Sequence, residues 1–330
     1  MKWLEKFLSQ QGEISTTHAE IIHRIETKKA QLDEVRPIPS YLLNKLKEQL
    51  HIEWSYNSNA IEGNTLTLSE TRIVLEQGMT VKGKSFKEHL EISNHHDAIE
   101  YVSQLAAKNE SLSNYTIRSI HELVLLKIDK EFAGTYRTGS VRITGTKFQP
   151  PEANEIQALM TELLDFIENN PKQLSTLLLS VLLHHRFVWI HPFFDGNGRT
   201  GRLLLNLFLL KNGFPPAVIL KADRQKYYTA LRKADAGDYN KLALLLFQSI
   251  ERTFDLYLSA ISSEFGYYKP IDDIVKEESV PYGQEYISLL ARKGKINAYK
   301  DNGVWFTTKE AVSEYVVGRK RKRTDLKYES

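Results

Sequence analysis

Twelve consecutive residues, His191-Pro-Phe-Phe-Asp-Gly-Asn-Gly-Arg-Thr-Gly-Arg202, combine side chains suited to chemistry on phosphate groups. Pro192 should end a preceding helix beside His191, and the Gly-Asn-Gly segment at 196–198 can adopt the unusual backbone angles of a tight loop. A helix that begins directly after these glycines would present its N-terminal N–H groups to an anion. Arg199 and Arg202 would add forked donors on the first turn. The sequence therefore predicts a phosphate-binding loop.

Two further side chains of this run could act on bound phosphates. An imidazole with an ordinary pKa of about 6.5 is mostly neutral at pH 7, so His191 could accept a proton from an attacking hydroxyl. Asp195 would lie beside the phosphates, where a cation such as Mg²⁺ or Mn²⁺ could be bound by its carboxylate and by phosphate oxygens. A lone histidine is more often structural, however, and His184, His185 and His191 could instead be metal ligands.

Composition is that of an ordinary globular protein. Of the 330 residues 42% are hydrophobic and 26% charged, and the absence of cysteine excludes disulfides, thiolate catalysis and Cys-based metal sites. No stretch approaches the length of a membrane-spanning apolar segment, and the first residues lack an apolar leader. We therefore expect a cytoplasmic protein.

The net charge of +3 is concentrated near the C-terminus. Residues 265–330 contain thirteen Lys and Arg against ten Asp and Glu, whereas the 31 basic and 31 acidic residues before them cancel. Only the C-terminal segment therefore offers a charge-based reason to bind nucleic acid.

Most of the chain before about residue 265 is predicted to be helical, because apolar residues recur at spacings of three and four. The clearest helical segments are 112–128, 156–167 and 174–189, and Thr67-Leu-Ser-Glu70 has the pattern of a capping box for a short helix that Gly78 ends. We expect a mainly α fold made of an N-terminal helical region (1–110), a core (111–265) and a small α+β domain (270–330).

Two segments favour β-structure. Residues 134–151 combine β-branched residues, turn glycines and a terminal Pro pair, which predicts a β-hairpin flap. Residues 296–306 have two β-like runs around Asp301-Asn302-Gly303, a strong hairpin signal. Helices are predicted on either side of that second hairpin, at 286–294 and 308–317.

The run His191–Arg202 resembles the complete signature of the Fic family, His-x-Phe-x-Asp/Glu-Gly-Asn-Gly-Arg-x-x-Arg, and the resemblance extends over roughly residues 40–260. It implies a Fic-type helical bundle that transfers AMP from ATP to a Ser, Thr or Tyr hydroxyl of a protein. By the same resemblance His191 is the general base, Asp195 the Mg²⁺ ligand and Phe193 the apolar anchor of the loop. The implied phosphate-binding residues are Gly196, Asn197, Gly198, Arg199 and Arg202.

The resemblance also suggests roles outside this loop. In the family the flap clamps the target segment by strand addition, which points to Val141, Arg142 and Ile143. Segments 223–228 and 237–240 are similar to the adenine-side helices of the family, with Tyr228 and Asn240 as candidates. Packing and capping are an equally good explanation for these last two residues.

Upstream, Ser58-Asn-Ala-Ile-Glu62-Gly63 resembles the inhibitory motif of the Fic class that carries it before the catalytic loop. Physically, the carboxylate of Glu62 could bind Arg202 where a γ-phosphate would otherwise bind, since both groups suit the same guanidinium fork. A solvated Glu62 at an ordinary helix end that Gly63 stops is the alternative.

Residues 270–318 are similar to a small winged-helix module, chiefly through the segments 285–300 and 304–306. DNA binding would use Arg292, Lys293, Lys295 and the run 319–323, but four acidic residues (Asp272, Asp273, Glu277 and Glu278) oppose a purely basic surface, so a protein-docking role is an equal alternative. Three functions thus stay open: AMP transfer including self-modification, a related phosphotransfer or AMP removal by the same site, and a DNA-binding regulator with a nucleotide-sensing core. A homodimer is also compatible with the sequence.

Overall fold

The computed structural model describes residues 2–143, 146, 148–265, 268–277 and 280–328, with side chains left undescribed at 2–3, 263–265 and 319–328. The chain divides into two compact units. The first contains Met1–Thr17 and Lys47–Ser249, and the second contains His18–Leu46 and Ile250–Ser330. Two of the three unit boundaries fall inside long helices, α4 (Ser40–Ile61) and α12 (Asn240–Phe265), and the other follows the end of α2.

The first unit is built from helices, which confirms the predicted mainly α fold. Besides parts of α4 and α12 it contains α1 (Lys2–Leu8), α2 (Gln11–Thr17), α5 (Leu68–Gln77), α6 (Phe86–Ala107), α7 (Asn114–Val124), α8 (Ile156–Asn169), α9 (Thr176–Ile190), α10 (Asn197–Lys211) and α11 (Arg224–Asp235), with short 3-10 turns η1 (Ala153–Glu155) and η2 (Lys221–Asp223).

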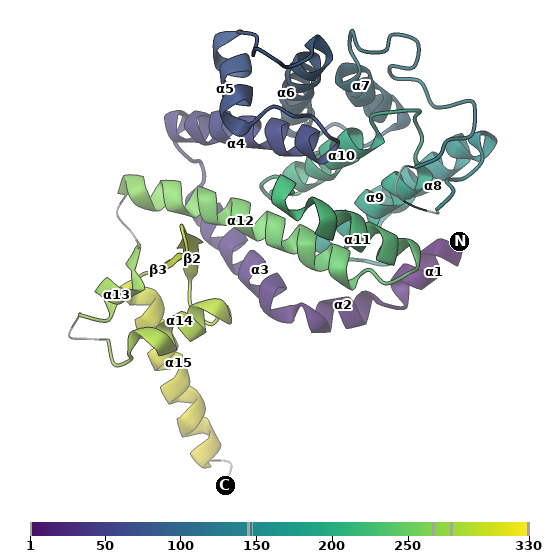
Figure 1. Ribbon diagram of the computed structural model, residues 1–330. Helices are drawn as coiled ribbons and strands as arrows, with labels where there is room; N and C mark the ends of the chain where they lie inside the picture. The colour runs from purple at the N-terminus through teal and green to yellow at the C-terminus, as the bar shows by residue number, and fades with distance from the viewer. Residues whose placement is uncertain (1, 144–145, 147, 266–267, 278–279, 329–330) are drawn as a thin grey trace. The chain divides into compact units, whose positions relative to one another are not determined.

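The centre of this unit is formed by α9 and α10. Both helices carry apolar residues on nearly every face, and a helix of that kind is stable only when it is buried. Leu182 and Phe187 of α9 and Leu204 of α10 are fully buried. The two helices pack against each other, and α10 also packs against α6 and α7 (Figure 1).

Local signals set the ends of several helices as predicted. Thr67 and Glu70 form a complete capping box at the start of α5, and the helix ends at Gly78 in the left-handed conformation. Ser85 and Glu88 form the same arrangement at the start of α6. The beginnings of α8 and α9 lie within a few residues of the predicted ones.

The predicted hairpin flap is not observed. Within the described residues of 134–151 there is no strand, and residues 144, 145 and 147 lie outside the described part of the chain. The backbone N–H of Arg137, which a hairpin would use for strand pairing, donates to the carbonyl of Pro192 at 2.9 Å. A tertiary contact therefore holds the start of this segment.

The second unit is a small α+β structure. It contains α3 (Ala19–Glu34), a three-stranded antiparallel sheet of order β1-β3-β2 and three further helices. The elements after α12 are β1 (Lys269–Pro270), α13 (Ile271–Ile274), α14 (Gln284–Arg292), β2 (Ala298–Asp301), β3 (Val304–Thr307) and α15 (Lys309–Tyr328). Their shared core includes Ile271, Ile287, Leu290, Ala298 and Val312.

The predicted C-terminal hairpin is confirmed. Tyr299 pairs with Phe306 and Asp301 with Val304, and the two-residue turn between the strands has positive φ at Asn302 (44°) and Gly303 (87°). Such a turn matches the right-handed twist of paired strands. The winged-helix assignment and the predicted domain boundaries stay predictions, and the side chains of the basic run 319–323 lie outside the described residues.

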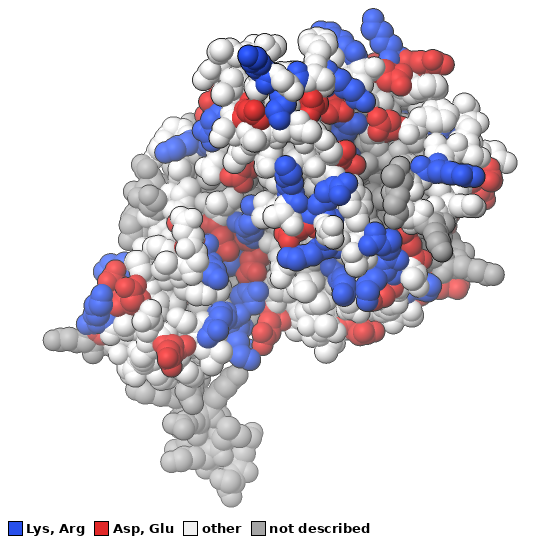
Figure 2. All heavy atoms as spheres, in the orientation of Figure 1, with Lys and Arg blue, Asp and Glu red and all other residues white. Residues whose placement is uncertain are grey.

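The surface charges and the apolar character of the helices can be compared with the sequence pattern. Figure 2 shows Lys and Arg mixed with Asp and Glu over the face in view, consistent with the cancelling charges of the first 264 residues. Among the described helices none combines the length and the apolar character needed to cross a bilayer.

Candidate active site

The helix α9 ends at the first residue of the predicted phosphate-binding loop. His191 is the C-terminal cap of α9, with a left-handed backbone (φ 52°), and its N–H donates to the carbonyl of Phe187 at 3.1 Å. Pro192 follows and cannot continue the helix. The chain therefore turns away at His191, as the sequence predicts.

The imidazole of His191 has a defined tautomer. Its Nδ1 lies 3.2 Å from the carbonyl oxygen of Val188, and because a carbonyl can only accept, Nδ1 carries the proton. Nε2 is left as the acceptor nitrogen. Burial lowers the pKa of His191 to about 4, so the ring is neutral at pH 7 and able to accept a proton.

Asn197 fixes the shape of the loop from within. Its side-chain Nδ2 donates to the carbonyl of Phe193 at 2.8 Å, and its Oδ1 accepts from the N–H of Phe193 at 2.9 Å. Asn197 is buried. This amide therefore ties the start of α10 to the backbone of Phe193.

Phe193 anchors the loop through a histidine that the sequence reasoning missed. The ring of Phe193 is fully buried and stacks on the ring of His121 in α7 at a centroid distance of 3.6 Å. His121 accepts from the N–H of Gly134 at Nδ1 and donates from Nε2 to the carbonyl of Asp195, each at 2.9 Å. Burial lowers the pKa of His121 to about 4, which keeps it in this neutral form at pH 7.

Arg137 is the second residue that sequence reasoning missed. Its guanidinium donates to the carbonyl oxygens of His191 (2.8 Å), Gly139 (2.9 Å) and Pro151 (2.6 Å). The side chain thus joins the loop 191–202 to both ends of the segment 139–151. No local pattern marks Arg137 or His121, because their partners lie far along the chain.

The start of α10 has the form of an anion site. Gly196 caps the helix in the left-handed conformation (φ 74°), which favours glycine, and no side chain caps the first N–H groups. Gly198 lies in the first turn, and a Cβ at this position would overlap the carboxylate of Glu62. Bare helix N-termini attract phosphate through these N–H groups and the helix dipole.

Asp195 lies just before α10, and Arg199 lies in its first turn. Oδ1 of Asp195 accepts from the N–H of Gly196 at 2.6 Å, and its Oδ2 lies 3.7 Å from Arg199. The Asp195 side chain is 61% exposed, whereas that of Arg199 is buried and lies 3.5 Å from Glu91 of α6. Asp195 therefore keeps an accessible carboxylate at the phosphate-binding end of α10.

Arg202 is held by the predicted upstream motif. Its Nη2 lies 2.8 Å from Oε1 of Glu62 and donates to the carbonyl of Ser58 at 2.8 Å, while its Nε donates to Oγ of Ser58 at 3.0 Å. Ser58 is in the last turn of α4, and Glu62 directly follows that helix, with Gly63 at φ 107° ending it. We call these contacts of Ser58 and Glu62 with Arg202 the arginine clamp.

A cleft of about 760 Å³ opens onto these groups. Its lining includes Glu62, Arg142, Ile143, His191, Asp195, Gly196, Asn197, Gly198, Arg199 and Tyr228. Tyr228 donates to Oε2 of Glu62 at 3.3 Å. Val141 and Asn240 are not part of the lining, and the Asn240 amide donates to Glu13 instead.

The histidines proposed as alternative metal ligands have other partners. Nε2 of His184 lies 2.8 Å from the hydroxyl of Tyr227, and Nε2 of His185 lies 3.1 Å from Asp235. Within the described part of the chain, these two residues and His191 do not converge as a ligand cluster.

Residues 111–209, from just before α7 into α10, match the family model described as Fic/DOC family. This part of the chain is a Fic/DOC-family domain. Protein adenylyltransferase Fic of Nematostella vectensis is 37% identical over 243 residues, which are 73% of this chain and 56% of that protein. The chain spans about half the length of the curated relatives it matches.

Solved Fic structures share the fold. A Fic-1 fragment from C. elegans matches with a TM-score of 0.69 at 27% identity, covering 78% of this chain and 76% of that chain. A Fic domain containing signaling protein from Bacteroides thetaiotaomicron gives a TM-score of 0.63 at 29% identity, covering 72% of this chain and 97% of that chain.

The Fic match accounts for the loop but not for everything around it. His121, Arg137 and the whole run His191–Arg202 lie inside the matched residues, whereas Ser58, Glu62 and Tyr228 lie outside them. The roles of individual residues, including the inhibitory one of Glu62, thus stay predictions.

Proposed function

We propose that the chain transfers AMP from ATP to a hydroxyl side chain of a protein, with His191 as the general base. The observation that carries this proposal is the hydrogen bond from His191 Nδ1 to Val188, which leaves Nε2 of a neutral imidazole as a proton acceptor at the cleft. Relatives named protein adenylyltransferase Fic support the same reaction class.

In this reaction Nε2 of His191 takes the proton of the target hydroxyl as its oxygen attacks the α-phosphorus of ATP. The bond from the α-phosphorus to its bridging oxygen breaks, and pyrophosphate leaves with the electron pair. N–H groups at the start of α10 and the guanidinium of Arg199 stabilise the negative charge on the phosphates. His191 then releases its proton to water.

Asp195 suits the divalent ion that such a reaction uses. Its carboxylate is accessible, and one oxygen is oriented by the N–H of Gly196. A hard cation such as Mg²⁺ or Mn²⁺ commonly binds one carboxylate together with phosphate oxygens, and when bound it would neutralise charge on the leaving pyrophosphate.

The segment 141–143 is the proposed docking site for the target. Arg142 and Ile143 line the cleft together with Phe148, whose ring packs against Trp189 at 5.5 Å. Arg137 joins Gly139 and Pro151, which lie on either side of this segment in the sequence, to His191. A target backbone that pairs with residues 141–143 would therefore be held at a fixed offset from His191.

We further propose that the arginine clamp keeps this site inactive. Nε of Arg202 binds Ser58 and Nη2 contacts Glu62. The Glu62 carboxylate also occupies the space beside Gly198. A phosphate needs both that space and the Nη2 donor that contacts Glu62, so ATP binds productively only when Glu62 leaves. Ser58 and Gly63 support this role by supplying the remaining acceptor and the helix end.

The test is transfer of radiolabel from ATP in the presence of Mg²⁺, with the protein itself and a cell lysate as targets. Label from α-labelled ATP, and none from γ-labelled ATP, is the expected result. Transfer of γ-label would identify phosphorylation instead. Salt-dependent DNA binding without any labelled product would favour the regulator, and loss of label from an AMP-modified target would reveal the reverse reaction.

Variants separate the two parts of the proposal. His191→Ala should abolish labelling, whereas Glu62→Gly should raise it by roughly 10- to 100-fold, the value of one charge-assisted interaction. Glu110→Gly is the matched control, because Glu110 also lies just beyond a long helix and is exposed, and it should leave labelling unchanged. A Glu62→Gly protein as inactive as the unmodified chain would overturn the inhibitory role of the clamp.

A further inference from the structure

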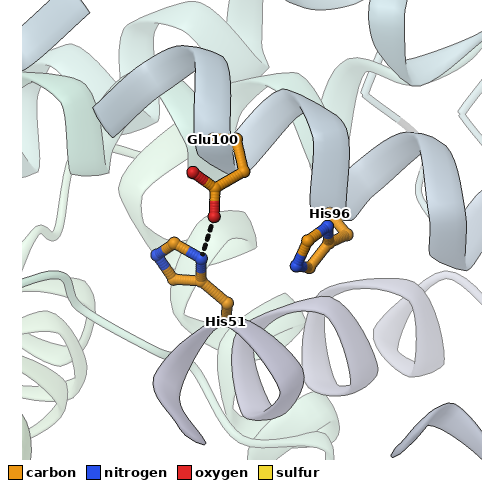
Figure 3. Close-up of side chains that lie close together, drawn as sticks. All are labelled: His51, His96 and Glu100. Carbon is orange, nitrogen blue, oxygen red and sulfur yellow. Dashed lines mark hydrogen bonds and ion pairs between the residues drawn. The ribbon is translucent and has the colours of Figure 1, made fainter. Parts of the chain in front are cut away.

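Two histidines and a glutamate meet outside the cleft, between α4 and α6. His51 comes from α4, and His96 and Glu100 come from α6 (Figure 3). One ligand atom from each lies within 4.8 Å of the other two. None of the three lines the active-site cleft or belongs to the family-matched residues.

We propose that His51, His96 and Glu100 form a binding site for a divalent transition-metal ion of the zinc type. Two imidazole nitrogens and one carboxylate oxygen are a ligand set that zinc accepts in proteins, with water completing the coordination. The hard ions Mg²⁺ and Ca²⁺ prefer oxygen ligands and would not select this site.

The spacing along α6 supports the proposal. His96 and Glu100 are four residues apart, so they lie one above the other on the same face of the helix. His51 meets them from the neighbouring helix, with its Nδ1 2.8 Å from Oε1 of Glu100 and its ring 6.0 Å from that of His96. Figure 3 shows Glu100 pointing toward the His51 ring, with His96 beside it.

Only small side-chain adjustments separate this arrangement from a metal complex. With zinc bonds of about 2.0–2.2 Å, ligand atoms of a tetrahedral site lie roughly 3.4 Å apart. The present separations of 2.8 to 4.8 Å bracket that value. His51 is rigidly buried at 9% side-chain exposure, while Glu100 (49%) and His96 (32%) are accessible enough to move.

The surrounding charges are compatible with a bound cation. Oδ1 of Asp97 lies 3.9 Å from Nδ1 of His96 and adds a second carboxylate to that of Glu100. Lys47 is near enough to act on His51 and opposes the cation, although it is exposed and therefore screened. A hydrogen bond between His51 and Glu100 would explain those two residues alone, but it leaves the second imidazole at the same point without a role.

The experiment uses the full chain, stripped with a chelator and kept free of nucleotide. Zn²⁺ is titrated against a chromophoric competitor, and Co²⁺ is added separately because its visible absorption reports coordination by nitrogen and oxygen. We expect one tight Zn²⁺ per chain, a Zn²⁺-dependent rise in Tm, and no such rise with Mg²⁺. His96→Ala and Glu100→Gln should each weaken binding by about tenfold or more, and neither side chain is part of the buried core.

Matched variants locate the ion. His23→Ala, at an exposed histidine of α3, should bind Zn²⁺ like the unmodified chain, and so should Asp195→Asn. Binding that survives in both His96→Ala and Glu100→Gln, or that disappears in Asp195→Asn, would overturn the proposal, as would the absence of any stoichiometric Zn²⁺ or Co²⁺ binding. Because the readout is metal binding, it is independent of AMP transfer.

Discussion

Lys28 and Arg202 are both buried cations, but their carboxylate partners differ. Lys28 of α3 contacts Glu251 at 2.8 Å and Asp255 at 2.5 Å, and both acidic side chains are only 13–14% exposed. Arg202 contacts the carboxylate of Glu62. The Glu62 side chain is 33% exposed and lines the cleft. The cluster around Lys28 is enclosed on two helices, whereas Glu62 lies at a helix end beside open space.

The difference explains why one cluster is structural and the other can be a switch. Loss of Lys28 from the enclosed cluster leaves the buried carboxylate of Asp255 without its cation, which costs more than the pair contributed. Arg202 keeps two hydrogen bonds to Ser58 when Glu62 leaves, and a phosphate can replace the carboxylate. Breaking the same kind of ion pair therefore costs much or little stability, depending on which groups remain around the charge that is left.

The largest expected effect is on Lys28→Met. Removing this cation leaves Glu251 with Arg24 but Asp255 without its partner, so we expect a loss of about 3–5 kcal/mol in the free energy of unfolding, measured by urea denaturation. Lys29→Met is the matched control, since its pair with Asp33 is more exposed and its loss should cost no more than about 0.5 kcal/mol. Equal effects of the two changes would break the comparison.

Glu62→Gln should have a smaller effect on stability and an opposite one on activity. We expect a loss of about 1–2 kcal/mol, because the carboxylate is partly solvated and Ser58 still contacts Arg202. AMP transfer should rise at the same time. Glu110→Gln should change neither quantity, and a stability loss as large as that of Lys28→Met would argue that Glu62 is structural.

Ser58→Ala should be milder still. Only the acceptor of Arg202 Nε is removed, since the carbonyl of residue 58 is backbone and stays in place. The expected cost is about 1 kcal/mol, with a modest rise in AMP transfer. Unchanged transfer with a measurable stability loss would limit Ser58 to a packing role.

The smallest expected effect is that of pH on the catalytic base. Burial lowers the pKa of His191 to about 4, so the base stays deprotonated as pH falls from 7 to 6 and is lost only as pH approaches 4. The acid limb of kcat/KM for the Glu62→Gly variant should therefore lie well below pH 6. A limb near pH 6.5 would mean that His191 is solvated when the enzyme works.

The parts predictable from the sequence are those that local chemistry decides. The capping box at Thr67, the end of α9 at His191 and the turn at Asn302-Gly303 each depend on neighbouring residues. The residues 134–151 have equally clear β-type composition, yet no strand forms among those described, and Arg137 at their start binds the loop 191–202 instead. Local preference was correct for the turns, while the N–H and side chain of Arg137 follow a tertiary contact that no local pattern indicates.

The site divides in the same way. The motif placed His191, Asp195, Asn197 and the glycines at one cleft, and their individual roles stay predictions. The bonds of the Asn197 side chain to the backbone of Phe193 were not foreseen. His121 and Arg137 could not be found, since a single histidine or arginine on a helix or loop has no distinguishing neighbours. The cluster of His51 with α6 was equally invisible before the helices were paired in space.

Under the inhibition proposed above, Glu62 would make the end of α4 a tethered competitor of the nucleotide. A ligand attached to its own receptor acts at a fixed effective concentration, typically millimolar or above for a short connection, that dilution of the protein does not change. Free nucleotide would thus compete at Arg202 with a carboxylate whose effective concentration is constant. The ATP concentration at which Glu62 is displaced from Arg202 in half of the molecules would then depend on the stability of the last turn of α4.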